Sequence, residues 1–426
     1  MKEIFKNIIV DQQERRYKNI SPRAYNIPMD TKKIVSLIGV RRSGKTYILY
    51  DLIEKLRQEM PLENIVYINF EDDRLYPVHL QDLDVLIQAY YELYPEKRTE
   101  KVYFFLDEIQ NIENWELFVR RIHDQLNIRL YITGSSSKLL SSEIATALRG
   151  RSITFEIFPF SFSEYLTYRK IPLNLHSSSA KSFIQNAFQT YLIQGGFVET
   201  FDEPPEIQRM ILKDYLDLIV YKDIVERYGI KNRALLRHLI KYFMVNPGTL
   251  VSFNKLYNEY KSMGYKIGKD TLYDYVSYLQ EAYTVFTVPV FAYSVREEMR
   301  NPRKIFVIDN GFKQLFDVSF SKDYSKLYEN LAFLHLRRKY REIHYAKSRQ
   351  EVDFYIKEAG LLLNVSYHLD DKPTFEREIN VLTEAMRTYK LNESYLITSD
   401  REESLKVEHK TIHIVPMWKW LLEDFI

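Results

Sequence analysis

The first third of the chain alternates short, continuously apolar runs with longer amphipathic stretches. The apolar runs predict buried strands at 34–39, 65–70, 102–106 and 129–133. The stretches between them have helical periodicity and lie at 47–59, 80–94 and 115–126. Because strands without polar alternation need cover on both faces, this order predicts a doubly wound α/β domain with a parallel sheet over residues 1–167.

The pattern changes after residue 167. Residues 180–228 are mostly helical and are interrupted at Gly195-Gly196 and at Pro204-Pro205. We expect a helical lid over 168–232. Three short helical stretches and a β ribbon follow at 235–244, 253–263, 271–281 and 285–293. This succession predicts a winged helix-turn-helix over 233–300. Strand-like and helical stretches alternate again over 301–426, which predicts a second α/β domain.

The composition is that of an ordinary globular chain and excludes several kinds of chemistry. The 426 residues are 46% hydrophobic and 28% charged, which suits two to four domains with cores of their own. Cysteine is absent, so disulfides, thiol nucleophiles and iron–sulfur clusters are excluded. The formal charge is only +2, so a nucleic-acid-binding face must be local. The longest uncharged apolar tract, 282–295, is too short to span a membrane, and we expect a cytoplasmic protein.

Residues 39–46 carry the strongest chemical motif in the sequence. They fit the phosphate-binding loop pattern G-x-x-x-x-G-K-[ST] and lie between a predicted strand and a predicted helix. In such a loop the backbone amides hold the β-phosphate, Lys45 reaches the β and γ oxygens in binding and catalysis, and the Thr46 hydroxyl binds Mg²⁺. The residues expected to bind ATP are Gly39, Arg41, Arg42, Ser43, Gly44, Lys45, Thr46 and Tyr47.

A second motif places two carboxylates at the end of an apolar strand. The run 102–106 is followed directly by Asp107 and Glu108, the Walker B arrangement. We expect Asp107 to bind the Mg²⁺ and Glu108 to polarise the attacking water. The pair favours hydrolysis of ATP over transfer of its phosphate to a small molecule, because a water nucleophile needs a positioned base.

Two further segments have residues suited to the γ-phosphate. The strand ending at Thr133 continues into Gly134 and three serines, where Ser135 or Ser136 is placed to sense the γ-phosphate, although a plain serine-rich turn has the same composition. Arg149 and Arg151 precede the strand-like stretch 152–157. Either is a candidate to stabilise transition-state charge, in cis or from a neighbouring subunit, and an exposed basic turn is the alternative.

These pieces, in this order, resemble a widespread prokaryotic family of AAA-type ATPases with a C-terminal domain named DUF4143. The segments that carry the resemblance are 107–110, 115–116, 158–165, 191–197, 221–224 and 351–354. The resemblance spans roughly residues 34–418. It implies a nucleotide-binding core, a helical lid, a winged helix and a nuclease-like α/β end over 301–426.

Binding of DNA is left open by the sequence. Residues 231–270 hold eight basic and two acidic side chains, a net charge of +6 in the segment that predicts a winged helix. The helix expected to enter the major groove, which begins near Thr271, carries Asp274 and few basic or amide side chains. Such a helix is poorly equipped to read bases, and a protein–protein joint is the other interpretation.

The C-terminal part resembles a PD-(D/E)xK nuclease core, with Glu329 and Asp353 at fitting positions. The Glu-x-Lys that such a core needs on the next strand is replaced by Asn364-Val365-Ser366. Losing a carboxylate and the lysine weakens metal binding and water positioning, so an active nuclease is disfavoured.

The sequence therefore predicts a Mg²⁺-dependent ATPase that couples its nucleotide state to a C-terminal binding module, with DNA or a protein as partner. The alternative is a non-enzymatic DNA-binding or scaffolding protein in which ATP is a structural ligand. An arginine that acts from a neighbouring subunit requires an oligomer, whereas one that acts in cis does not.

Overall fold

Two compact units make up the chain, Met1–Phe158 and Pro159–Ile426. The computed structural model describes residues 1–134, 147–316, 324–347, 349–369 and 371–423. The first unit ends at Phe158 rather than at the expected residue 167. The reason is that the backbone amide of Phe160 donates to the carbonyl of Gly196, 2.7 Å away, and so ties the following segment to the helices of the second unit.

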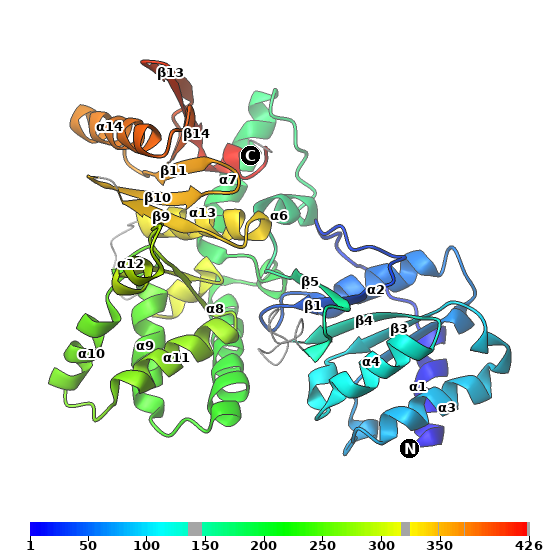
Figure 1. Ribbon diagram of the computed structural model, residues 1–426. Helices are drawn as coiled ribbons and strands as arrows, with labels where there is room; N and C mark the ends of the chain where they lie inside the picture. Colours follow the sequence, from blue (N-terminus) through cyan, green and yellow to red (C-terminus); the bar gives the residue numbers. More distant parts are fainter. Residues whose placement is uncertain (135–146, 317–323, 348, 370, 424–426) are drawn as a thin grey trace. The chain divides into compact units, whose positions relative to one another are not determined.

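The first unit contains a five-stranded, fully parallel sheet (Figure 1). Its strands are β1 (Ile34–Ile38), β2 (Ile65–Asn69), β3 (Val102–Asp107), β4 (Ile128–Gly134) and β5 (Ser152–Glu156). They lie in the order β2-β3-β4-β1-β5, so that β4 separates β1 from β3. The predicted α/β domain with a parallel sheet is confirmed. The four predicted apolar runs correspond to strands β1 to β4.

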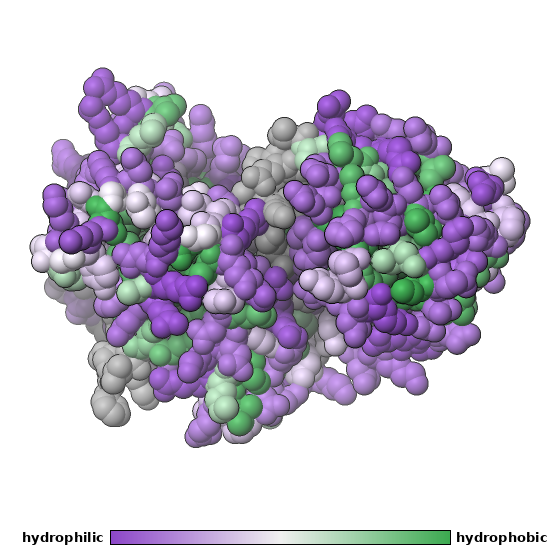
Figure 2. Space-filling view, turned by 90° about the horizontal axis from the view of Figure 1, so that it is seen from below, coloured by the Kyte–Doolittle hydropathy of each residue, from purple (hydrophilic) through white to green (hydrophobic). Residues whose placement is uncertain are grey.

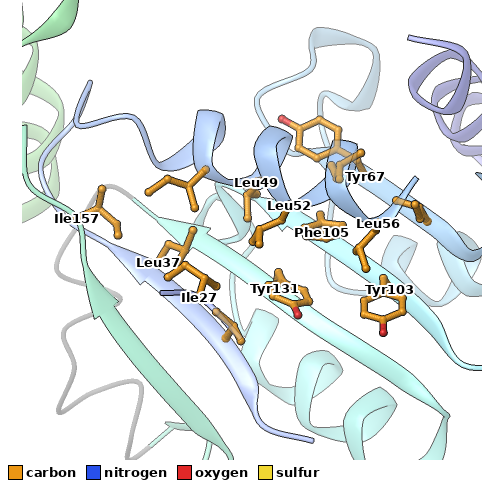
Figure 3. Close-up of a cluster of buried hydrophobic side chains, with 14 residues drawn as sticks. Ile27, Leu37, Leu49, Leu52, Leu56, Tyr67, Tyr103, Phe105, Tyr131 and Ile157 are labelled. Atoms are coloured by element: carbon orange, nitrogen blue, oxygen red, sulfur yellow. The ribbon is translucent and has the colours of Figure 1, made fainter. Parts of the chain in front are cut away.

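Helices cover both faces of this sheet. Neighbouring residues of a strand point to opposite faces, and one set packs beneath α2 (Lys45–Leu56), as Figure 3 shows for Leu37, Phe105 and Tyr131. On the other face, Phe104 meets the ring of Tyr90 in α3 (Asp82–Leu93). Beside α3 lies α1 (Lys2–Glu14), and α4 (Trp115–Gln125) leads into β4. Strands β1 to β4 are buried on both sides, which explains why they lack polar alternation, whereas β5 is half-buried along its whole length.

The second unit begins with helices. They are α6 (Phe162–Tyr168), α7 (Ser178–Gln194), α8 (Pro205–Leu218) and a π-helical turn η7 (Ile219–Glu226). Ser161 and Glu164 cap α6 reciprocally: the Ser161 amide donates to the Glu164 carboxylate at 2.7 Å, and the Glu164 amide donates to the Ser161 hydroxyl at 3.2 Å. This capping box gives the serine and glutamate of the motif at 158–165 a structural role.

Three helices and a three-stranded antiparallel sheet follow, in the chain order helix, strand, helix, helix, strand, strand. The elements are α9 (Arg233–Val245), β6 (Leu250–Val251), α10 (Phe253–Ser262), α11 (Lys269–Glu281), β7 (Val285–Val288) and β8 (Arg303–Val307). Strand β8 is central, in the order β6-β8-β7. A short helix, α12 (Val295–Arg300), lies between β7 and β8 in sequence and buries none of its residues.

A six-stranded mixed sheet forms the rest of the second unit. Its strands are β9 (His344–Lys347), β10 (Glu351–Ile356), β11 (Leu361–Val365), β12 (Glu393–Thr398), β13 (Glu403–Val407) and β14 (Lys410–Pro416), in the order β13-β14-β12-β11-β10-β9. Strands β9, β10 and β11 form an antiparallel meander, and β12 then pairs in parallel with β11. The helices are α13 (Ser325–Lys339), α14 (Lys372–Thr388) and the short α15 (Met417–Trp420).

Two glycines after α7 explain the motif at 191–197. A Cβ on Gly195, whose φ is +82°, would lie 1.7 Å from an Asp309 carboxylate oxygen, and one on Gly196 would lie 2.2 Å from the Phe160 carbonyl. The Gly196 amide donates to Asp309 at 2.7 Å. The motif therefore holds three segments of the second unit together by close backbone approach, which only glycine allows.

In the described part of the chain, no helix is both long and apolar enough to cross a membrane. On the face that Figure 2 shows, hydrophilic residues dominate and apolar side chains gather only in small separate patches.

Candidate nucleotide-binding site

The loop between β1 and α2 has a backbone that requires its two glycines. Gly39 has φ +145°, and a Cβ there would lie 2.1 Å from the carbonyl oxygen of Ile157. Gly44 has φ +93° and precedes the first turn of α2, whose N-terminal amides lack intrahelical partners. The loop thus presents backbone donors and a positive helix end at one point, which is the arrangement that binds phosphate.

Lys45, the first residue of α2, folds back over this loop. Its ammonium donates to the carbonyl oxygens of Gly39 and Val40, at 3.0 Å each, and its side chain is buried. Ser43 is also buried, whereas Arg42, at φ +64°, is exposed. The buried ammonium adds a positive charge to the concavity that the loop amides form.

The carboxylate of Asp107 lies at the end of β3, next to the first turn of α2. Thr46 and Tyr67 each donate a hydroxyl hydrogen bond of 2.8 Å to one of its oxygens, and Thr133 donates to the other. Burial raises the pKa of Asp107, an effect that the Thr133 hydrogen bond opposes. Within the described residues, no lysine, arginine or histidine pairs with this carboxylate.

A divalent cation fits the Asp107 carboxylate and the Thr46 hydroxyl. Both supply oxygen ligands, which Mg²⁺ prefers, and in the described part of the chain the buried Asp107 carboxylate is contacted by hydroxyl groups, which carry no positive charge. These two residues are the ones from which the sequence predicted the metal site, and the fold brings them into direct contact.

Glu108 follows Asp107 with a left-handed backbone, at φ +54°. Its amide donates to the Thr133 hydroxyl at 3.0 Å, and its carboxylate accepts a hydrogen bond from Gln110. Glu71 lies nearby, 3.6 Å from Arg41, and burial together with the charge of Glu108 raises the pKa of Glu71. Glu108 is thus turned out of the strand direction and held beside the cluster around Asp107.

Thr133 and Tyr67 were missed as site residues by the sequence reasoning. Thr133 lies at the end of β4, in the segment that was considered for its serines, and its hydroxyl group contacts both Asp107 and the Glu108 amide. Its position at a strand end next to the Walker B strand is the clue that would have found it. Tyr67, inside β2, had no such clue. Ser135, the predicted sensor, lies outside the described residues.

A segment before β1 also reaches the loop. Arg23 donates to the carbonyls of Ser43 and Phe158, at 2.7 Å each, and the Phe158 amide donates to the Tyr25 hydroxyl at 2.9 Å. Beside it lies a hollow of about 160 Å³, which Tyr25 and Tyr47 help to line. Tyr47 is 55% exposed. This polar, basic lead-in to the sheet had not been recognised as part of the site.

Arg149 and Arg151 lie at the opposite edge of the sheet. They precede β5, whose first residue pairs with Ile34, the first residue of β1, whereas the phosphate loop follows the last residue of β1. Five residues of strand separate the two edges by roughly 16 Å. Arg151 forms two hydrogen bonds of 2.8 Å with Asp124. The strands therefore hold both arginines at the edge away from the phosphate loop of their own chain.

Comparison with known proteins agrees with this geometry. Residues 31–166 match the family described as "AAA domain". "Uncharacterized protein MJ1544" of Methanocaldococcus jannaschii is 36% identical to the chain, over 99% of this chain and 96% of that protein. The chain belongs to the AAA-domain family of P-loop proteins. An "Uncharacterized protein" of Haemophilus influenzae is 30% identical, over 92% of this chain and 95% of its own length.

The C-terminal family is not the expected one. Residues 185–319 of this AAA-domain protein match "Domain of unknown function (DUF8612)". The prediction of a DUF4143 domain was therefore wrong. The predicted AAA family of the N-terminal part is confirmed.

Solved structures resemble the chain only weakly. The Aeropyrum pernix ORC1 protein in complex with DNA has a TM-score of 0.32 at 12% identity, over 67% of this chain and 87% of that one. The Thermotoga maritima RuvB Holliday junction branch migration motor has a TM-score of 0.30 at 19% identity, over 67% of this chain and 88% of that one.

Replacing Thr133 by valine tests the cluster around Asp107. The change removes one hydroxyl from Asp107 and leaves the buried Glu108 amide without its acceptor, which costs about 1–3 kcal/mol. We expect ATP turnover to fall about 10- to 100-fold while ATP binding changes little, as measured by phosphate release and nucleotide titration. Tyr67→Phe is the matched control, since it removes a hydroxyl from Asp107 without touching Glu108, and its loss should be smaller. Wild-type turnover in Thr133→Val would contradict the role of this hydroxyl.

Proposed function

We propose that the protein binds Mg²⁺ and ATP and hydrolyses the ATP. The observation that carries this proposal is the convergence of four side chains at one edge of the sheet: Lys45 and Thr46 after β1, Asp107 as the last residue of β3, and Glu108 directly after it. A cytoplasmic location, where ATP is abundant, belongs to the same proposal.

Each residue has a role that follows from its chemistry. When ATP is bound, Lys45 exchanges its two loop carbonyls for β- and γ-phosphate oxygens, which are stronger acceptors because they are charged. Thr46 and Asp107 hold Mg²⁺, which neutralises phosphate charge. Glu108 accepts a hydrogen bond from the attacking water as that water's oxygen bonds to the γ-phosphorus and the bond to the β–γ bridging oxygen breaks. The products are ADP and inorganic phosphate.

The remaining predicted contacts are proposed on their position. The loop residues Gly39, Arg41, Arg42, Ser43 and Gly44 surround the phosphates through their amides and side chains. Tyr47 and Tyr25 border the hollow beside α2, which we assign to the adenine base because two tyrosines line it and Tyr47 directly follows Thr46 of the phosphate loop.

Glu108→Gln and Lys45→Ala test this proposal together. Glu108→Gln keeps the shape of the side chain and removes the base, so it should bind ATP and lose about 10²- to 10⁴-fold in turnover. Lys45→Ala removes the buried ammonium and should abolish tight binding. Phosphate release and titration with a fluorescent ATP analogue measure both. If the wild-type protein binds ATP without turnover, the alternative holds, in which ATP is a structural ligand.

Arg149 is proposed to act on the nucleotide of a neighbouring chain. It is exposed, and among the described residues it has no hydrogen bond or ion pair, whereas Arg151 is held by Asp124. An exposed cation at the edge opposite its own phosphate loop is suited to another subunit's γ-phosphate, and it implies that the active form is an oligomer.

Mixing two inactive variants tests the arginine. Lys45→Ala cannot bind nucleotide but keeps Arg149, and Arg149→Ala keeps an intact loop. If Arg149 acts between chains, the mixture should recover turnover well above the sum of the two separate proteins. No recovery, with wild-type turnover in Arg149→Ala alone, would remove this arginine from the mechanism. Arg151→Ala serves as the comparison for loss of charge at the same edge.

DNA binding is a second candidate function, carried by a hollow in the second unit. We propose that α9, β6, α10, α11, β7 and β8 form a winged helix, with α12 in the position of the wing; the order of three helices and a three-stranded antiparallel sheet supports this. A hollow of about 550 Å³ lies among α10, α11, β7 and α12. Its charged lining residues are Lys269, Arg300 and Arg303, and none of its lining residues is acidic. Among the described residues, none of these three cations forms an ion pair.

The position of Lys269 supports an anionic ligand for this hollow. Lys269 is the first residue of α11, where the helix dipole disfavours a cation. The cost disappears when a phosphate is shared between the ammonium and the helix N-terminus. The hollow therefore adds Arg300 of α12 and Arg303 of β8 to Lys269 of α11, and the contacts it offers are to phosphate rather than to base edges.

Two exposed cations can be removed to test this surface. Lys269→Ala together with Arg300→Ala should weaken binding of duplex DNA and lower the slope of log affinity against log salt by about 2. Lys181→Ala together with Lys213→Ala, two exposed lysines on α7 and α8, makes the same change of charge and should leave the slope unchanged. DNA binding that is equal in both double variants would assign it to another surface, and no salt-dependent binding by the wild type would end this candidate.

A further inference from the structure

Two oppositely charged side chains of the first unit meet beside the phosphate loop. A guanidinium nitrogen of Arg41, Nη1, lies 3.6 Å from a carboxylate oxygen of Glu71. Arg41 belongs to the loop itself, and its side chain is 21% exposed, whereas that of Glu71 is 49% exposed. Glu71 lies outside every motif found in the sequence. The ion pair therefore joins the loop to a residue that no sequence pattern connects with it.

The register of the sheet brings Glu71 to the edge that holds Asp107 and Glu108. Strands β2 and β3 are parallel, and Asn69, the last residue of β2, lies opposite Asp107. The Phe70 amide then donates to the Asp107 carbonyl at 3.0 Å. The Glu71 amide donates to the side chain of Asn69 at 2.9 Å, which turns the chain after the strand. Glu71 is thus held at this edge by the hydrogen bonds of a turn.

Glu71 and Glu108 are close enough to repel each other. Partial burial and the negative charge of Glu108 raise the pKa of Glu71, and the positive charge of Arg41 opposes this effect. The Arg41 guanidinium therefore lies on the side of the phosphate loop that faces Glu108, the residue proposed to polarise the attacking water. The γ-phosphate of ATP belongs on this side, because the water attacks it from there.

The pair of Arg41 and Glu71 is a loose one. Hydrogen bonds between oppositely charged groups are usually about 2.7–2.9 Å long, and the separation of 3.6 Å exceeds this. A half-exposed carboxylate also keeps much of its hydration, so the pair contributes little to stability. A phosphate oxygen matches the planar guanidinium at least as well. Exchange of one anion for the other is therefore cheap.

We propose that Arg41 exchanges Glu71 for the γ-phosphate when ATP binds, and that Glu71 is the positioning residue that holds Arg41 ready for it. This inference rests on the proposed binding of ATP at this site and adds the group that distinguishes ATP from ADP. ADP has no γ-phosphate, so Arg41 stays with Glu71 when ADP is bound. Arg41 thereby supplies, within one chain, a positive charge that Arg149 and Arg151 cannot, since they lie at the opposite edge of the sheet.

Arg41→Gln in the full-length protein tests the contact with the γ-phosphate, because glutamine removes the charge and keeps part of the side-chain length. The affinity for an ATP analogue with nitrogen in place of the β–γ bridging oxygen should fall about 10- to 100-fold, whereas the affinity for ADP should change less than about 3-fold. Titration calorimetry with Mg²⁺ present measures both.

Arg129→Gln is the matched control for loss of a paired arginine. Arg129 lies 3.0 Å from Asp30, its side chain is 16% exposed, and it stands at the start of β4, at the edge opposite the phosphate loop. This variant should leave both affinities unchanged.

Glu71→Gln tests the exchange. The change releases Arg41 and removes a negative charge, so the ATP analogue should bind more tightly relative to ADP. If Arg41 has to leave Glu71 to reach the phosphate, this gain should be about 2- to 5-fold larger in the wild-type background than in Arg41→Gln. A gain of equal size in both backgrounds means that Glu71 acts only as a distant negative charge, and it overturns the exchange.

Equal losses of affinity for the ATP analogue and for ADP in Arg41→Gln overturn the contact with the γ-phosphate. If Arg41→Gln does not fold, Arg41→Lys decides instead, since it keeps the charge on a shorter side chain without the planar guanidinium. A lower affinity for the ATP analogue relative to ADP then supports the proposal, and an unchanged ratio overturns it. These measurements use binding alone, so a protein that binds ATP without turnover fails the proposed hydrolysis and still decides the role of Arg41. A wild type that binds neither nucleotide contradicts both.

Discussion

In the first unit, β4 lies between β1 and β3, and the three strands run in the same direction. Parallel strands end at a common edge, so the loop after β1, the hydroxyl of Thr133 and the carboxylate of Asp107 are brought together by backbone hydrogen bonds alone. The contacts of Asp107 with Thr46 and Thr133 depend on this register. The same register places Arg149 at the opposite edge of the sheet. Arg149 is therefore separated from the phosphate loop of its own chain and is placed for the proposed contact with a neighbouring chain.

Two largely buried carboxylates, Asp107 and Asp353, differ in the groups that contact them, and this difference decides whether their charge is balanced within the chain. Asp107 is held by three hydroxyl groups, which orient it and leave its charge for a cation to balance. Asp353 faces an ammonium, which supplies the cation from within the chain. Burial makes an unbalanced charge costly in both places. The first arrangement leaves a negative charge without a cation among its contacts, and in the second Lys304 supplies the cation.

Prediction from sequence succeeded where the information is local. The phosphate loop needs glycines at fixed spacing, and Asp107 follows an apolar strand, so both are visible in a short window. The four strands and the helices of 233–281 were found by periodicity. The C-terminal family was wrong, because short motifs such as that at 351–354 identify a segment without identifying the domain around it. Glu351 was quoted in that motif, yet its contact with Lys304 spans 47 positions of sequence.

The sequence by itself determined the α/β class and the phosphate-loop motif of the AAA-domain family, because strand burial and loop conformation follow from neighbouring residues. Only the tertiary structure decided which side chains meet. Thr133 joins Asp107 to Glu108 because β4 is inserted between two strands that precede it in the chain. Lys304 pairs with Asp353 because β8 packs against β10. Such long-range pairing is set by sheet order and packing, which no short stretch of sequence encodes.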